Sequence, residues 1–154
     1  MSRLRKFLLA ILIGFVAIQF VQPARNTNGQ VLATDITKVV FVPDSVQMLL
    51  KIACYDCHSN KTNYPFYAYV QPIGWLLNSH IQEGKKQLNF SDFGAISKRR
   101  QESKLKSITS QIKDEAMPLP AYTILHKNAI LAQAEKDLII HWANTAKDSL
   151  SNIN

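Results

Sequence analysis

The chain has 154 residues, of which 47% are hydrophobic and 9% aromatic, so it can form one modest domain with a real core. Its formal net charge is +7, but four of its 18 Lys and Arg residues lie in the first 25 residues, which contain no Asp or Glu. The rest of the chain has no dense basic stripe, which excludes nucleic acid from the predicted partners.

The first predicted element is an apolar segment at the N-terminus. Arg3, Arg5 and Lys6 precede an almost unbroken hydrophobic run from Phe7 to Val21. Basic residues before such a run are typical of a signal peptide or a signal anchor. The run would span roughly 22 Å as a helix, against a hydrocarbon core of ~30 Å. Because no good cleavage site follows it, we predict that residues 1–25 form an uncleaved transmembrane signal anchor.

This segment also predicts where the protein lies. We expect a single-pass protein of the bacterial inner membrane, anchored by its N-terminus, with the folded part facing the periplasm. The alternative is a periplasmic protein from which the N-terminal segment has been cleaved. Residues 26–43 contain Gly29 and Pro43 and are predicted to be a tether, with Val39–Val42 as a brief strand or an extended arm.

Residues 44–150 are predicted to fold as one domain, and their apolar residues recur at helical spacing. Pro43-Asp44-Ser45 indicates a helix start, and this helix runs into Cys54. No alternating strand pattern is present, so the predicted fold class is all-α. The further helices are expected from Pro72 to about Leu88, over 92–116, and over 132–147 with Leu138, Ile139 and Trp142 buried.

The two cysteines lie in the sequence Cys54-Tyr55-Asp56-Cys57-His58. This C-x-x-C-H pattern is the signature of c-type haem attachment. The spacing lets two thiols add to the two vinyl groups of a porphyrin, and the next residue, His58, is then delivered to the iron. We therefore predict one covalently bound haem c, attached through Cys54 and Cys57 and ligated by His58.

Two other interpretations of the motif remain open. A C-x-x-C pair in an exported protein can form a redox disulfide of the thioredoxin type, although that motif usually follows a strand. The pair with His58 can also begin a zinc site, but no further cysteine exists, so remote histidines would have to complete it.

The sixth ligand of the iron is predicted to be Met117. It lies 59 residues beyond His58 and begins the proline-stiffened segment Met117-Pro118-Leu119-Pro120. A thioether ligand raises the reduction potential relative to a second histidine. Two alternatives remain, one in which Met117 only fills the core and one in which His80, on an otherwise apolar helical stripe, is the ligand.

Other side chains are candidates for the surroundings of the haem. Lys85 and Lys86 are either propionate partners or solvated surface lysines. Aromatic side chains would lower the local dielectric and shield the haem edge. The aromatic candidates are Tyr64, Tyr67, Tyr69, Trp75 and Tyr122.

The stretch from Cys54 to Trp142 resembles the bacterial haem-binding domain family. The matching residues are Cys54-Tyr55-Asp56-Cys57-His58-Ser59-Asn60, Tyr64-Pro65, Gln71-Pro72, Trp75, His80-Ile81, Gly84-Lys85, Leu88-Asn89-Phe90-Ser91, Met117-Pro118-Leu119, Tyr122 and Trp142-Ala143. The resemblance implies a membrane-tethered periplasmic monohaem domain with haem attachment to Cys54 and Cys57 and axial ligation by His58. The domain is also similar in outline to class I cytochromes c, which implies Met117 as the distal ligand.

The predicted function is electron transfer by a c-type cytochrome-like protein rather than catalysis, with redox partners that the sequence does not name. The alternative function is a haem-based sensor or a peroxidase-like protein whose sixth ligand is displaceable. A thiol oxidoreductase without haem is the third possibility.

Overall fold

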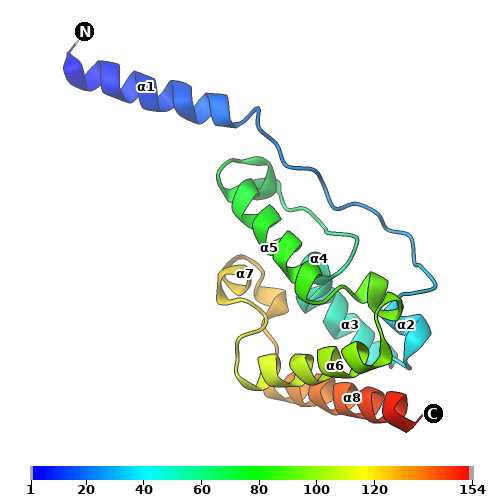
Figure 1. The fold of residues 1–154 in the computed structure, drawn as a ribbon. Helices are drawn as coiled ribbons and strands as arrows, with labels where there is room; N and C mark the ends of the chain where they lie inside the picture. Colours follow the sequence, from blue (N-terminus) through cyan, green and yellow to red (C-terminus); the bar gives the residue numbers. More distant parts are fainter. Residues whose placement is uncertain (1, 153–154) are drawn as a thin grey trace.

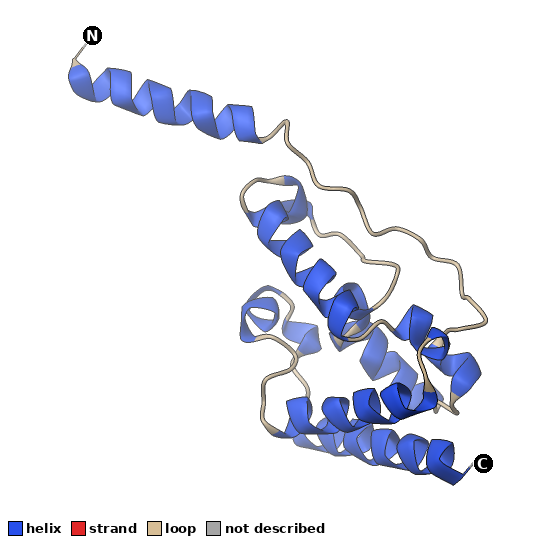
Figure 2. Ribbon diagram, viewed as in Figure 1, coloured by secondary structure: helices blue, strands red, loops and turns tan. Residues whose placement is uncertain are grey.

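A computed structural model describes residues 2–152 of the chain, and these residues form helices and no β-strand (Figure 2). The all-α prediction is therefore confirmed. The α-helices are α1 (Arg3–Ile18), α2 (Ile36–Val39), α3 (Asp44–Ala53), α4 (Tyr55–His58), α5 (Ile73–Gln87), α6 (Lys98–Lys113), α7 (Pro120–Leu125) and α8 (Gln133–Asn152). The 3₁₀ helices are η1 (Phe66–Tyr69), η2 (Phe90–Ala95) and η3 (Lys127–Ala129).

The N-terminal helix α1 extends away from the rest of the molecule (Figure 1), and none of its side chains is buried. It has 16 residues, about 24 Å at the usual rise per residue, less than the ~30 Å of a bilayer core. No helix within residues 2–152 is both long enough and apolar enough to span a membrane. The predicted transmembrane helix is therefore wrong, and so is the predicted single-pass location in the inner membrane.

The core is formed mainly where α6 and α8 pack side by side, with α3 against α8 (Figure 1). Leu105, Ile108 and Ile112 line one face of α6 at helical spacing, and all three are buried. On α8 the buried residues include Ile139 and Trp142, as predicted. Residues from α2, α3, η2 and η3 complete this cluster, which holds α3 and the cysteine motif that follows it.

Residues 26–43 contribute to this core. Ile36 is fully buried, Val40 is buried beside it, and the Trp142 indole N–H donates to the Phe41 carbonyl oxygen at 2.9 Å. The segment Val39–Val42 is predicted from the sequence to be a brief strand or an extended arm, and neither describes all of it. Val39 ends the short helix α2, whereas Val40 is extended. The Asp35 carboxylate accepts from the Thr37 backbone N–H at 3.0 Å and begins that helix.

Two other predicted elements differ from the structure. The helix expected over 92–116 is divided, because the backbone is extended at Ile96 and Ser97 and α6 begins only at Lys98. This break places η2 against α2 and leaves α6 free to pack on α8. Leu138, predicted to be buried, is 37% exposed.

Candidate functional site

The cysteine motif lies at a break between two helices. Cys54 follows the last residue of α3 and caps it, donating its N–H to the Leu50 carbonyl at 2.9 Å. Its own carbonyl accepts the N–H groups of Cys57 at 3.2 Å and His58 at 2.9 Å. These bonds form α4, which is a single helical turn. Two cysteines separated by one turn lie on the same side of the backbone. The local fold therefore presents Cys54, Cys57 and His58 together.

The His58 ring is fixed by the end of α5. Its Nδ1 lies 2.9 Å from the carbonyl oxygen of Leu88, which can only accept, so Nδ1 carries the proton. Burial lowers the pKa of His58 and so favours the neutral ring, with backbone hydrogen bonds opposing that shift. The lone pair of Nε2 is therefore available to a metal, which is the arrangement that metal-bound histidines adopt.

Gly84 lets α5 approach the motif closely. A Cβ atom at this position would lie 2.8 Å from the Cys57 carbonyl oxygen and 3.2 Å from the Cys57 Cβ. No side chain larger than hydrogen fits there without moving one of the two helices. The close packing of α5 on α4 brings Leu88 within reach of His58.

Met117 is positioned by the end of α6. The Gln111 carbonyl accepts the backbone N–H groups of Ala116 at 3.0 Å and of Met117 at 3.1 Å. The chain reverses at Glu115, whose φ of 55° lies in the left-handed region common at helix ends. The Met117 side chain is partly buried, and Pro118 follows it.

Cys54, His58 and Met117 line one cavity with two lobes. Both lobes are lined by Ala53, Cys54, His58, Gln87, Met117 and Pro118. The α6 lobe, about 300 Å³, is completed by Leu50, Leu88, Phe90, Lys104, Ser107, Ile108, Gln111 and Ile112. The Tyr122 lobe, about 310 Å³, is completed by Asp56, Cys57, His80, Glu83, Gly84, Leu119 and Tyr122. Each lobe has the size of a small-molecule site.

A hydrogen-bonded aromatic cluster connects the segment after Met117 to the motif. The Tyr122 hydroxyl donates to Asp56 Oδ2 at 2.8 Å, and the Tyr122 ring stacks on His126 with centroids 4.0 Å apart. The other side of His126 meets the Tyr67 hydroxyl, which is 2.5 Å from Nε2. Burial, followed by the bond to Asp56, raises the pKa of Tyr122, so this residue remains a neutral phenol. Sequence reasoning named Tyr122 as a lining residue but missed its link to Asp56.

A model of the haem-binding domain family matches residues 13–145 of the chain. The chain belongs to this family. No curated protein and no solved structure matches it. The family's description names haem as the ligand.

The residues of the cavity fit a haem. Two thiols, an imidazole nitrogen and a thioether sulfur are the groups that attach and ligate a c-type haem, and all four line the cavity. Leu50, Ile108 and Ile112 provide the apolar surface that a porphyrin face requires. Within residues 2–152 no group of three or more His, Cys, Asp or Glu side chains is placed to hold a metal ion.

The thiols of this haem-binding domain are protonated at neutral pH. Burial raises the pKa of Cys54 to about 12, with a smaller contribution from Cys57. Burial and the nearby Asp56 carboxylate raise the pKa of Cys57 to about 11. Catalytic cysteine pairs have lowered pKa values because the thiolate is the nucleophile. The surroundings of Cys54 and Cys57 have the opposite effect.

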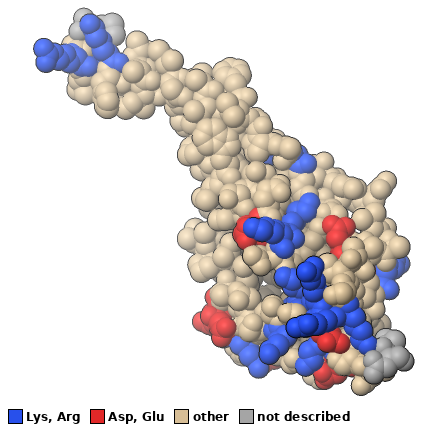
Figure 3. Space-filling view, viewed as in Figure 1, with Lys and Arg blue, Asp and Glu red and all other residues tan. Residues whose placement is uncertain are grey.

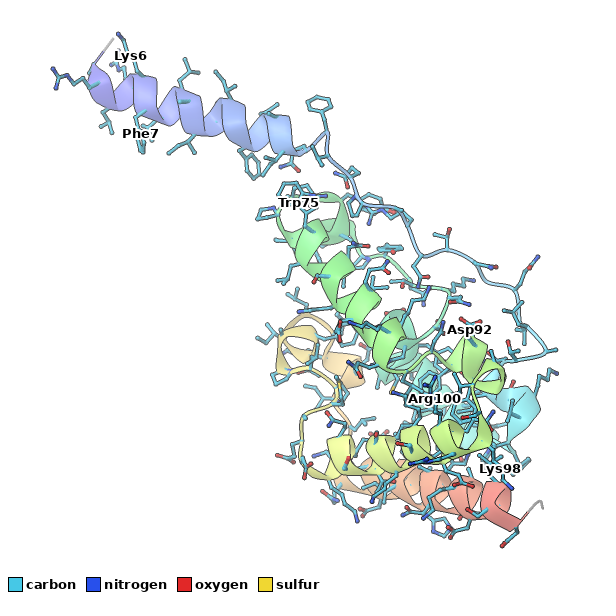
Figure 4. The ribbon with its side chains drawn as sticks, viewed as in Figure 1. Lys6, Phe7, Trp75, Asp92, Lys98 and Arg100 are labelled. Atoms are coloured by element: carbon cyan, nitrogen blue, oxygen red, sulfur yellow. The ribbon has the colours of Figure 1, made fainter. Side chains whose placement is uncertain are left out.

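Several candidate residues lie away from the cavity. Tyr64 and Tyr69 enclose the Arg25 guanidinium, 4.6 and 4.3 Å from the ring centroids. Trp75 lies at the end of α5 nearest to the N-terminal segment (Figure 4), and its indole N–H donates to the Val21 carbonyl. Among the aromatic candidates only Tyr122 lines the cavity.

The lysines suggested as propionate partners also lie elsewhere. The Lys85 ammonium donates to Asn26 Oδ1 at 2.7 Å, and Lys86, largely exposed, is 3.8 Å from Glu83. His80 lines the Tyr122 lobe, whereas His126 lies between Tyr67 and Tyr122.

Proposed function

We propose that this haem-binding domain is a monohaem electron carrier with one haem c. Thioethers from Cys54 and Cys57 attach the cofactor, and His58 and Met117 ligate its iron. When bound in this way, the iron exchanges one electron between its ferrous and ferric states. The observation that supports the proposal is that all four side chains line one largely apolar cavity.

The neutral thiols suit thioether formation. In each attachment the S–H bond adds across a vinyl C=C bond, so that sulfur bonds to one carbon and hydrogen to the other, and no oxidant is needed. The cysteines hold the porphyrin edge at one turn of helix. His58, which follows directly and whose ring is fixed by Leu88 at 2.9 Å, presents Nε2 beside it.

We propose Met117 rather than His80 as the second ligand of the iron. His80 belongs to α5, the helix that packs on α4 and whose end holds His58. A side chain from that helix would come from the same wall of the cavity as His58, whereas a second ligand would have to reach the iron from the other side. Met117 comes from a separate segment, after α6, and lines both lobes.

The proposal is tested on protein produced together with a haem-attachment system. We expect the intact mass to increase by one haem and the reduced protein to give sharp low-spin bands. Met117→Ala should keep the attached haem, lose the low-spin spectrum and lower the potential. Met48→Ala is the control, because Met48 is 59% exposed on α3 and does not line the cavity.

Other outcomes identify the alternatives. An unchanged spectrum in Met117→Ala, together with a high-spin spectrum in His80→Ala, would assign the sixth position to His80. A wild-type protein that is high-spin and changes its spectrum with CO or peroxide would favour a sensor or a peroxidase-like protein. Colourless protein with free thiols would refute the proposal.

A further inference from the structure

The two lobes of the cavity differ in charge. Among the residues that the structure describes, Lys104 is the cationic side chain of the α6 lobe, and no Asp or Glu lines that lobe. Asp56, Glu83 and His80 line the Tyr122 lobe, where the described part of the chain places no Lys or Arg. An anionic group that enters this cavity is therefore attracted to the α6 lobe and repelled by the Tyr122 lobe.

The positions of the two cysteines also favour placing the anionic end of a haem in the α6 lobe. Cys57 lines the Tyr122 lobe only, whereas Cys54 lines both lobes. The vinyl groups of a haem occupy one edge of the porphyrin, and its two propionates occupy the opposite edge. Because both cysteines line the Tyr122 lobe and only one of them lines the α6 lobe, a haem with its vinyl edge at the cysteines would extend its propionate edge toward the α6 lobe.

Lys104 is free to take a carboxylate. In the described part of the chain, the ion pairs of lysines involve Lys86, Lys136 and Lys147, so Lys104 has no acidic partner there. Its side chain is partly buried, which limits the screening of its charge by water. Lys and Arg side chains also gather over the part of the surface where α6 lies (Figure 3).

A second donor lies two turns further along α6. Gln111 lines the same lobe and has an amide N–H₂ group, whereas the Ser107 hydroxyl between them donates to the Ser103 carbonyl at 3.0 Å. Lys104 and Gln111 are seven residues apart, so they project from the same face of the helix. This face presents one cation and one neutral donor to the cavity.

We propose that Lys104 and Gln111 form a carboxylate-binding subsite that holds a haem propionate in the α6 lobe. This inference rests on the proposed function, and it fixes which way round the porphyrin lies. The Lys104 ammonium and the Gln111 amide donate to the propionate oxygens, and the apolar porphyrin faces contact Leu50, Ile108 and Ile112.

The test uses two probes and the full-length protein made without haem attachment. Iron protoporphyrin IX carries two propionate carboxylates, whereas its dimethyl ester carries two neutral methyl esters in their place. Comparing the two probes therefore isolates the contribution of the carboxylate charge. We expect Lys104→Gln to weaken binding of the free acid about tenfold, the usual effect of losing one charge-assisted hydrogen bond, and to leave ester binding unchanged. Lys104→Arg should restore most of the affinity for the free acid.

Lys106→Gln is the matched control, because Lys106 is exposed on the same helix and does not line the cavity. An equal effect of Lys104→Gln and Lys106→Gln would mean that only the overall charge matters and would overturn the subsite. Equal loss of acid and ester binding in Lys104→Gln would overturn it as well. Failure of the wild-type protein to bind either probe would contradict the proposed function itself.

A second readout uses the protein with attached haem. Without Lys104 a propionate ionises less readily, so the reduction potential of Lys104→Gln should become pH-dependent at a higher pH than in the wild type. Lys106→Gln should behave as the wild type. If the pH dependence is the same in all three proteins while the haem remains attached, the subsite is refuted and the electron-carrier proposal stands.

Discussion

Two sides of the cavity are fixed in different ways. We call them the His58 wall, formed by α4 and α5, and the Met117 wall, formed by the segment that follows α6. On the His58 wall, α5 lies so close to α4 that only a glycine fits at position 84, and the imidazole is bonded to a backbone carbonyl. On the Met117 wall, a short segment leaves the end of α6 through two backbone hydrogen bonds, and its contact with the motif is the Tyr122–Asp56 bond.

The difference indicates which wall adapts to the cofactor. Packed backbone cannot move by a few tenths of an ångström without disturbing two helices. The Met117 segment is joined to the motif by the one Tyr122–Asp56 hydrogen bond, and breaking that bond costs about 1–2 kcal/mol. We therefore expect changes to the His58 wall to affect folding and attachment, and changes to the Met117 wall to affect ligation.

The largest expected effect concerns the thiols of the His58 wall. The folded-state pKa values of Cys54 and Cys57 are raised to about 12 and about 11, from 9.0. Above pH 9 the unfolded chain therefore loses these protons first. Stability that is fully present below pH 9 should fall by about 1.4 kcal/mol per pH unit for each thiol until the folded pKa is reached. Urea unfolding of haem-free protein between pH 8 and 11 measures this loss.

Thioether formation removes the titrating protons, so the protein with attached haem should lack this alkaline loss. Tyrosines ionise in the same pH range, and their contribution is common to both forms. The haem-free Cys54→Ala, Cys57→Ala double variant is the control and should also lack the loss. Equal slopes in all three proteins would show that the cysteines are not buried as thiols.

The next effect is predicted for Gly84→Ala. The new Cβ meets a backbone oxygen at 2.8 Å, so one helix must shift. Overpacking of this kind costs about 1–3 kcal/mol, and the better helix propensity of alanine offsets up to about 1 kcal/mol. We expect a net destabilisation in urea unfolding and a lower yield of attached haem.

Gly14→Ala is the matched control, because Gly14 is also helical and its Cβ would meet nothing within 4 Å. That variant should be as stable as the wild type or slightly more stable. If Gly84→Ala behaves in the same way, the close packing of α5 on α4 does not hold the motif.

The comparison of the two walls also explains what the sequence could predict. The motif residues were found because Cys54, Cys57 and His58 are local, and their spacing alone defines the chemistry. The start of α3 and the span of α5 followed from proline and helical spacing. The bond from His58 to Leu88 joins residues 30 apart, and no pattern in a single sequence signals it.

The sequence also could not predict which lysines lie beside the cavity, because that depends on tertiary packing. Lys85 and Lys86 are propionate candidates in the sequence, but in the fold the Lys85 ammonium donates to Asn26. Lys104 lies among polar residues of α6, and no pattern in the sequence marks it as a residue that lines the cavity. At the N-terminus, the basic residues before an apolar run suggested a membrane span, whereas the 16-residue length of α1 decides against one.

The smallest effect is expected for Tyr122→Phe on the Met117 wall. The substitution removes the bond to Asp56 Oδ2 but keeps the ring that stacks on His126. The loss should lower the free energy of unfolding by about 1–2 kcal/mol, because the bond joins a phenol to a carboxylate that is otherwise held by Asn63. With attached haem, imidazole should displace the sixth ligand about fivefold more readily in this variant, measured by absorbance titration of the ferric protein.

Tyr69→Phe is the control for Tyr122→Phe, since the Tyr69 ring contacts the Arg25 guanidinium and Tyr69 does not line the cavity. It should leave imidazole binding unchanged. If Tyr122→Phe also leaves imidazole binding unchanged while its stability falls, the Tyr122–Asp56 bond supports the fold without positioning Met117. In that case the two backbone hydrogen bonds that the Gln111 carbonyl accepts, from Ala116 and Met117, hold the methionine by themselves. The Met117 wall would then be as rigid as the His58 wall.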